Sequence, residues 1–130
     1  MVTIKIGERD YPLALTVASV DKMEDLCGGL ANIPNYMGGG DFRAAGAATC
    51  NVLAELMAEG EAVAALEAAL AGEERAAVRV PTAEELGHLL SPAMIVVARS
   101  AAMEAVMASI ARTIEVADDP KNADGGAGTP

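Results

Sequence analysis

The stretch VTIKIGERDYPLALTV, residues 2–17, decides the fold that we expect. Residues 2–6 and 11–17 both alternate between apolar and polar side chains, which is the pattern of a half-buried β-strand. Residues 7–10 between them have the composition of a turn, so the chain is expected to open with an antiparallel β-hairpin. Its apolar faces consist of Val2, Ile4 and Ile6 on the first strand and of Tyr11, Leu13, Leu15 and Val17 on the second.

This hairpin needs a cover from the rest of the chain. A two-stranded hairpin is marginally stable in water by itself. Pro12 lacks an N–H group, so its strand is expected to lie at a sheet edge. The remaining sequence supplies helical patterns, and the expected fold is mainly α with a small β part, in which the N-terminal hairpin packs on a bundle of about four to five helices.

The predicted helices are bounded by caps and by glycine. Asp41 is an expected N-cap, and Thr82 with Glu85 forms a capping box. Gly60 either stops or kinks the middle helix. Ser19 is the N-cap expected for the first helix, and Ser91 with Pro92 for the last. The predicted helical ranges are 20–27, 42–59, 61–71, 83–90 and 92–116.

Two segments are predicted to lie outside the helices. Residues 28–40 are rich in Gly, Pro and Asn and are expected to form a loop. Residues 118–130 contain no large apolar side chain and are expected to form a disordered tail. We therefore predict a single domain over residues 1–117.

Composition excludes several classes of function. The 130 residues carry a net charge of −10, which disfavours binding to nucleic acid or to anionic membranes. Cys27 and Cys50 form no disulfide or zinc pattern. The sequence shows no signal peptide and no uncharged apolar stretch of about 18 residues, so a cytoplasmic location is expected.

No catalytic or metal-binding constellation is evident. His88 follows Glu84 and Glu85 at helical spacing. This pattern is either half of a metal site or a solvated histidine at a helix end. Asp41 directly follows the glycines at 38–40, where a phosphate would bind, which argues against a phosphate loop. Cys50 has no histidine nearby in the sequence. We therefore expect no enzymatic activity, no cofactor and no metal.

Five residues are candidates for contact with a partner protein. Tyr36 and Met37 lie in the predicted loop, where they are either exposed contacts or fold back onto the junction of hairpin and helices. Arg99 projects into an apolar stripe of the last helix, so it pairs inside the fold, snorkels, or faces a partner. Met103 and Met107 belong to that stripe, which is either core or an adaptable surface for a helical partner. The whole stripe consists of Val96, Met103, Met107, Ile110 and Ile114.

The order of these features resembles the tail assembly chaperones of long-tailed phages and prophages, including tail proteins of gene transfer agents. The resemblance begins in residues 4–13, IKIGERDYPL, and continues through residues 15–17, LTV, and the helix end MEDLCG at 23–28. It extends over about residues 2–115. Further matching features are Glu59-Gly60, the helix start at Thr82–Leu86 and the helix that begins at Ser91-Pro92.

The resemblance implies a small, mainly helical protein without catalysis. Its implied partner is the long helical tape measure protein, which such chaperones keep soluble until the tail tube assembles. Self-association is a further possibility, and so is a longer product made by programmed frameshifting. The alternative function is a structural minor tail protein or head–tail connector of a prophage, which would remain in finished particles.

Overall fold

The N-terminal hairpin is present, with its second strand earlier than predicted. In the computed structural model, which describes residues 1–111, strand β1 (Thr3–Ile6) pairs antiparallel with β2 (Arg9–Pro12). Only Gly7 and Glu8 form the turn, with φ of 64° at Gly7. The predicted strand 11–17 is therefore wrong beyond Pro12. Leu13 and Leu15 are still buried as predicted, because the extended chain after β2 carries them under the helices.

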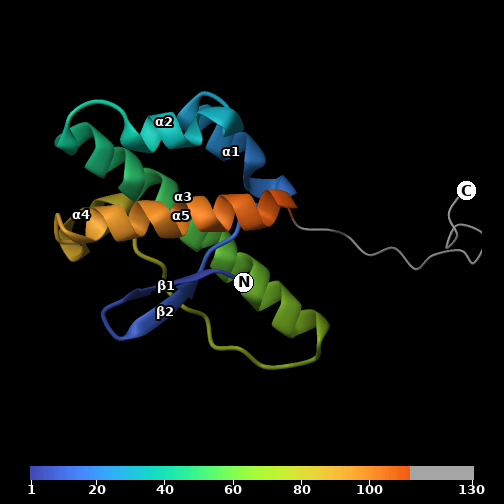
Figure 1. Cartoon of the computed structure of the whole chain (residues 1–130). Helices are drawn as coiled ribbons and strands as arrows, with labels where there is room; N and C mark the ends of the chain where they lie inside the picture. Colours follow the sequence, from blue (N-terminus) through green and yellow to red (C-terminus); the bar gives the residue numbers. More distant parts are fainter. Residues whose placement is uncertain (112–130) are drawn as a thin grey trace, which may run out of the picture.

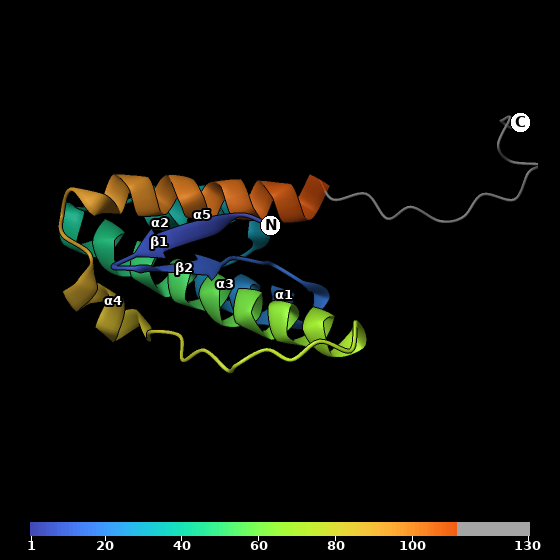
Figure 2. The ribbon, with the colours of Figure 1, turned by 90° about the horizontal axis from the view of Figure 1, so that it is seen from below.

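Helices cover the apolar face of the hairpin, as expected for a mainly α fold with a small β part. Strand β2 packs on α3 (Phe42–Leu70), and β1 packs on α5 (Met94–Ala111). Figure 2 shows the hairpin flanked by α5 on one side and α3 on the other, and the two helices also pack directly on each other. Pro12 pairs only with Thr3 of β1, so its strand is an edge strand of a two-stranded sheet, as its missing N–H requires.

Gly60 does not stop the middle helix. Helix α3 runs unbroken through this residue, and the predicted helices 42–59 and 61–71 are one element. A Cβ atom at Gly60 would lie 1.9 Å from the carbonyl oxygen of Pro12. The glycine therefore lets the hairpin backbone approach the helix directly.

The first helix, α1 (Val17–Cys27), begins three residues earlier than predicted. Its N-cap is Thr16, and Ser19 is the reciprocal partner in a capping box, so Ser19 lies inside the helix instead of before it. The hydroxyl of Ser19 accepts a hydrogen bond from the Thr16 N–H at 2.9 Å. Gly28, in the left-handed conformation, ends the helix as predicted.

The predicted loop over residues 28–40 is largely helical. A 3-10 turn, η1 (Leu30–Asn32), leads into the short helix α2 (Ile33–Gly38). Ile33 and Met37 are one helical turn apart and fully buried, and α2 packs on α3. Burial of these two side chains outweighs the breaker content of the segment.

Helix α3 is the centre of the molecule. It packs against β2, α1, α2, α4 (Ala83–Leu89) and α5 (Figure 1). The Asp41 side chain caps it as predicted and accepts a hydrogen bond from the Ala44 N–H at 2.8 Å. Its buried large side chains include Val52, Leu53, Leu56 and Met57.

The last two helices follow the predicted order. The Thr82–Glu85 capping box is confirmed: the Thr82 hydroxyl accepts from the Glu85 N–H at 3.1 Å, and the Glu85 carboxylate accepts from the Thr82 N–H at 2.9 Å. Helix α5 begins at Met94, two residues after the predicted start. The predicted end of this helix and the predicted tail over 118–130 lie outside the described residues.

Candidate partner-binding site

The titratable residues of the described chain form no metal-binding cluster. Within residues 1–111, no three His, Cys, Asp or Glu side chains converge. His88 and Glu84 are exposed on α4. Cys27 and Cys50 are buried free thiols, and burial raises the pKa of each above its ordinary value, which disfavours the reactive thiolate.

Tyr36 and Met37 do not form an exposed pair. Met37 is fully buried in the core under α2, so its predicted exposure is wrong. Tyr36 is half-buried, and its hydroxyl accepts a hydrogen bond from the Asn51 side-chain amide at 3.1 Å. The two residues fold back, as the alternative expectation had it, but onto α3 and not onto the junction of hairpin and helices. Tyr36 thereby fixes a residue on the surface of α3.

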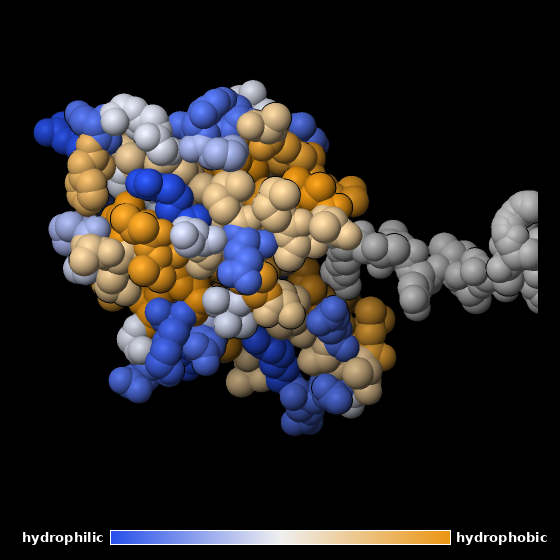
Figure 3. Space-filling view, viewed as in Figure 1, coloured by the Kyte–Doolittle hydropathy of each residue, from blue (hydrophilic) through white to orange (hydrophobic). Residues whose placement is uncertain are grey.

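Helix α5 turns the predicted apolar stripe largely outward. Val96, Met107 and Ile110 are each more than half exposed, and Met103 is partly buried. The interpretation of this stripe as core is therefore wrong for these three side chains. The opposite side of the helix faces α3 and the hairpin; its buried residues are Ile95, Ala98, Ala102, Ala105 and Val106. Figure 3, which looks onto α5, shows many apolar groups over this helix.

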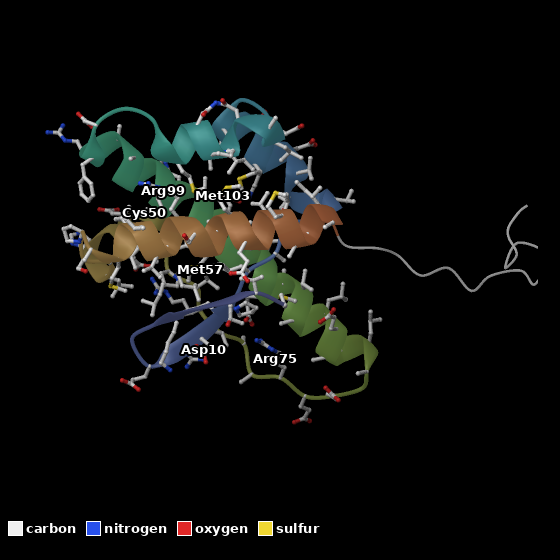
Figure 4. The ribbon with its side chains drawn as sticks, in the orientation of Figure 1. Asp10, Cys50, Met57, Arg75, Arg99 and Met103 are labelled. Atoms are coloured by element: carbon white, nitrogen blue, oxygen red, sulfur yellow. The ribbon has the colours of Figure 1, made fainter. Side chains whose placement is uncertain are left out.

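Arg99 lies at the edge of this outer face. Figure 4 shows Arg99 and Met103 on the side of α5 toward α1 and α2. The Nε atom of Arg99 is buried and has no hydrogen-bond partner among residues 1–111. The ion pairs in that range join Arg75 to Glu61 and Arg79 to Glu85. The expectation of an ion pair inside the fold is thus not met within the described residues.

A groove between α3 and α4 was missed from the sequence. It encloses about 570 Å³, and most of its surface is apolar. Phe42, the only phenylalanine of the chain, lines this groove and is 59% exposed. The walls are built mainly from small or apolar residues, together with Arg43, Asn51 and Glu84; the others include Gly46, Ala47, Cys50, Ala83, Gly87, Leu90 and Ile95.

Side chains on both helices that line this groove make polar contacts with neighbouring elements. Asn51 lines the α3 wall and is held by Tyr36 of α2. Arg79 donates to the Glu85 carboxylate at 2.5 Å at the start of α4. This guanidinium and the Thr82 N–H hold the pKa of Glu85 below its ordinary value. These contacts hold side chains at the edges of the two helices that line the groove.

Small side chains at helical spacing were the sequence signal for the groove. Gly46 and Cys50 are four residues apart on α3, as are Ala83 and Gly87 on α4. Residues four apart share a helix face. A Cβ atom at Gly46 or at Gly87 would meet nothing within 4 Å. The sequence gives these two faces, but only the packing of α4 on α3 places them opposite each other.

Helix α5 also satisfies a simple test for membrane spans. Residues Met94–Ala111 are long and apolar enough to cross a bilayer, and 28% of that window is buried inside the protein. Arg99 and Glu104 lie near the middle of the window. A helix of this kind is also found in protein cores, and α5 packs on α3 and β1.

Known proteins give no guide to which of these surfaces is used. Comparison of the chain with protein-family models, with curated proteins and with solved structures finds no match.

Proposed function

We propose that this chain is a tail assembly chaperone of a phage or prophage, which binds the tape measure protein and keeps it soluble during tail assembly. The observation that carries the proposal is the apolar groove between α3 and α4. The order of an N-terminal hairpin followed by capped helices, which resembles this family, supports it. The proposed activity is binding, without catalysis or a cofactor, in the host cytoplasm.

The groove suits an apolar side chain carried on a partner helix. Its volume of about 570 Å³ is within the ordinary range for binding pockets, which are mostly apolar with a few polar groups. Small residues on both walls, such as Gly46 and Gly87, leave room for the partner. Amphipathic helices bind by placing apolar residues into such grooves.

The net negative charge of the chain suits the second part of the proposed function, which is to keep the bound partner soluble. A net charge of −10 gives each complex a strong like-charge repulsion from its neighbours. A long apolar helix covered by acidic subunits would therefore remain dispersed. Arg99, Met103 and Met107 remain proposed contact residues on a separate surface, the outer face of α5, which need not bind the same partner as the groove.

Co-expression tests this function. The chain is produced together with the tape measure protein encoded in the same genome, and the soluble fraction and co-purification are measured. We expect the tape measure protein to become soluble and to co-purify, and the chaperone to be absent from finished particles. Presence of the chain in particles, without binding to the free tape measure protein, would support a structural minor tail or connector protein instead.

A variant that fills the groove tests the surface. Gly46→Leu places a large side chain where the structure is open, so we expect binding to be lost while the fold is retained. Gly46→Ala is the matched control, because it gives the same helix-stabilising effect with little added volume. Undiminished binding by Gly46→Leu would exclude the groove as the site.

A further inference from the structure

The outer face of α5 has the spacing of a coiled-coil seam. Five exposed or partly buried residues along it follow one another at intervals of four, three, four and three, which is the alternation of d and a positions in a heptad repeat. We define the α5 seam as Val96, Ser100, Met103, Met107 and Ile110. In this register Val96, Met103 and Ile110 occupy d positions, and Ser100 and Met107 occupy a positions.

The charged residues beside the seam occupy the two positions that pair between helices. Arg99 precedes an a position and is therefore at g, whereas Glu104 follows a d position and is at e. In a parallel two-stranded coiled coil, a g residue of one helix lies near the e residue five positions later in the other helix. Arg99 and Glu104 are five positions apart and have opposite charge.

This arrangement is complementary to itself. A two-fold axis parallel to α5 would place Arg99 of each copy beside Glu104 of the other, so that both pairs form at once. Neither residue takes part in an ion pair within residues 1–111. The Nε atom of Arg99 is already removed from water without a partner, which makes a carboxylate beside this side chain favourable.

We propose that the free protein forms a parallel dimer through the α5 seam, with Arg99 of each copy paired to Glu104 of the other. The seam buries Val96, Met103, Met107 and Ile110 against their counterparts. Figure 2 shows α5 along the upper edge of the molecule, with the strands and α3 below it. This inference concerns the free protein and does not depend on the tape measure protein being its partner.

Other occupants suit the seam less well. The sequence after Val116 contains no large apolar side chain that would cover it. A lipid bilayer would place Arg99 and Glu104 near the middle of the hydrocarbon, where charged groups are unfavourable. The seam involves only about five turns of one helix on each side, so the dimer is expected to be small and reversible.

Charge exchange tests the pairing. The full chain, Arg99→Glu, Glu104→Arg and the double variant are compared by sedimentation velocity over a wide range of concentration, with circular dichroism as a check on folding. We expect each single variant to raise the dimer Kd by about tenfold or more, because like charges then face each other. The double variant is expected to restore the dimer to near the original Kd.

Several results would overturn the proposal. These are a wild-type chain that stays monomeric at every concentration, single variants that leave the Kd unchanged, and a double variant that is not restored. Glu104 is exposed, so Glu104→Arg remains informative even where Arg99→Glu disturbs the fold. Binding of the wild-type monomer to neutral phosphatidylcholine vesicles, in place of dimerisation, would assign the seam to lipid.

A cysteine variant tests the parallel orientation. In this register the two Ser100 residues face each other across the axis, so Ser100→Cys is expected to form a disulfide-linked dimer under mild oxidation. Ala108→Cys, which is also exposed on α5 but away from the seam, is the matched control and is expected to remain monomeric. The native cysteines are buried and do not compete. Equal cross-linking of both variants would contradict the parallel seam.

Discussion

Helices α3 and α5 are both rich in apolar residues, but they differ in how far the rest of the chain packs around them. Helix α3 is packed by the hairpin and by four other helices. Helix α5 packs mainly on α3 and β1, and its far side exposes Val96, Met107 and Ile110. The difference shows that apolar content alone does not identify a core helix. Helix α3 is packed by other elements of the chain, whereas one apolar face of α5 is exposed.

The largest expected effect comes from making the same substitution in both helices. Met57 of α3 is fully buried, and Met107 of α5 is 57% exposed. We expect Met57→Ala to lower the free energy of unfolding by about 2–5 kcal/mol, through lost burial and the cavity that remains. Met107→Ala is expected to cost less than about 0.5 kcal/mol in the monomer.

Denaturant unfolding at low protein concentration measures both values. Low concentration matters because Met107 belongs to the proposed dimer seam, and association would add to its apparent stability. Equal losses in the two variants would mean that α5 is as fully packed as α3, which would remove the contrast between them.

The contrast also holds between two glycines within α3. Gly60 touches the hairpin backbone, whereas Gly46 faces the open groove. We expect Gly60→Ala to destabilise the fold by about 1–3 kcal/mol, because the new Cβ forces Pro12 to move. Gly46→Ala is expected to stabilise it by about 0.5–1 kcal/mol, since alanine is the better helix former.

Thermal unfolding of the two alanine variants gives the sign of each change directly. A stabilising Gly60→Ala would show that the hairpin does not rest on the helix at this point. A destabilising Gly46→Ala would show that the groove is closed by neighbouring atoms.

Local chemistry made several elements predictable from the sequence. Asp41 and the Thr82–Glu85 pair provide hydrogen-bond acceptors for backbone N–H groups that a helix start leaves unpaired. Alternation in residues 2–6 placed Ile4 and Ile6 on the buried face. Such features depend on neighbours within a few residues, so one sequence contains the information.

Features that depend on distant residues were not predictable in the same way. Helix α2 forms because Ile33 and Met37 are buried against α3, although its composition is typical of a loop. The buried face of α5 is built largely from alanine, which allows a close approach to its neighbours. The sequence pattern singled out the stripe of larger side chains on the opposite face and left open whether that stripe is core or surface. The groove required the placement of α4 on α3.

The smallest expected effect concerns α4, the short helix between α3 and α5 in the sequence. At the start of α4, Arg79 and the Thr82 N–H lower the pKa of Glu85. A carboxyl group whose pKa is lower in the folded chain stabilises the fold above its unfolded pKa, near 4.5, and this contribution is lost as the pH falls through the folded value. The pair is exposed, so its contribution is small and is weakened by salt.

Glu85→Gln isolates this contribution. We expect the variant to have a slightly lower thermal midpoint than the wild type at pH 7, and the difference to shrink as the pH falls below about 4.5. Arg79→Gln is the matched control, because it removes the charge partner and leaves the capping carboxylate in place. Its deficit should shrink over the same range of pH. If the difference in thermal midpoint stays constant with pH, the shape of the Glu85 side chain, and not its charge, stabilises the start of α4.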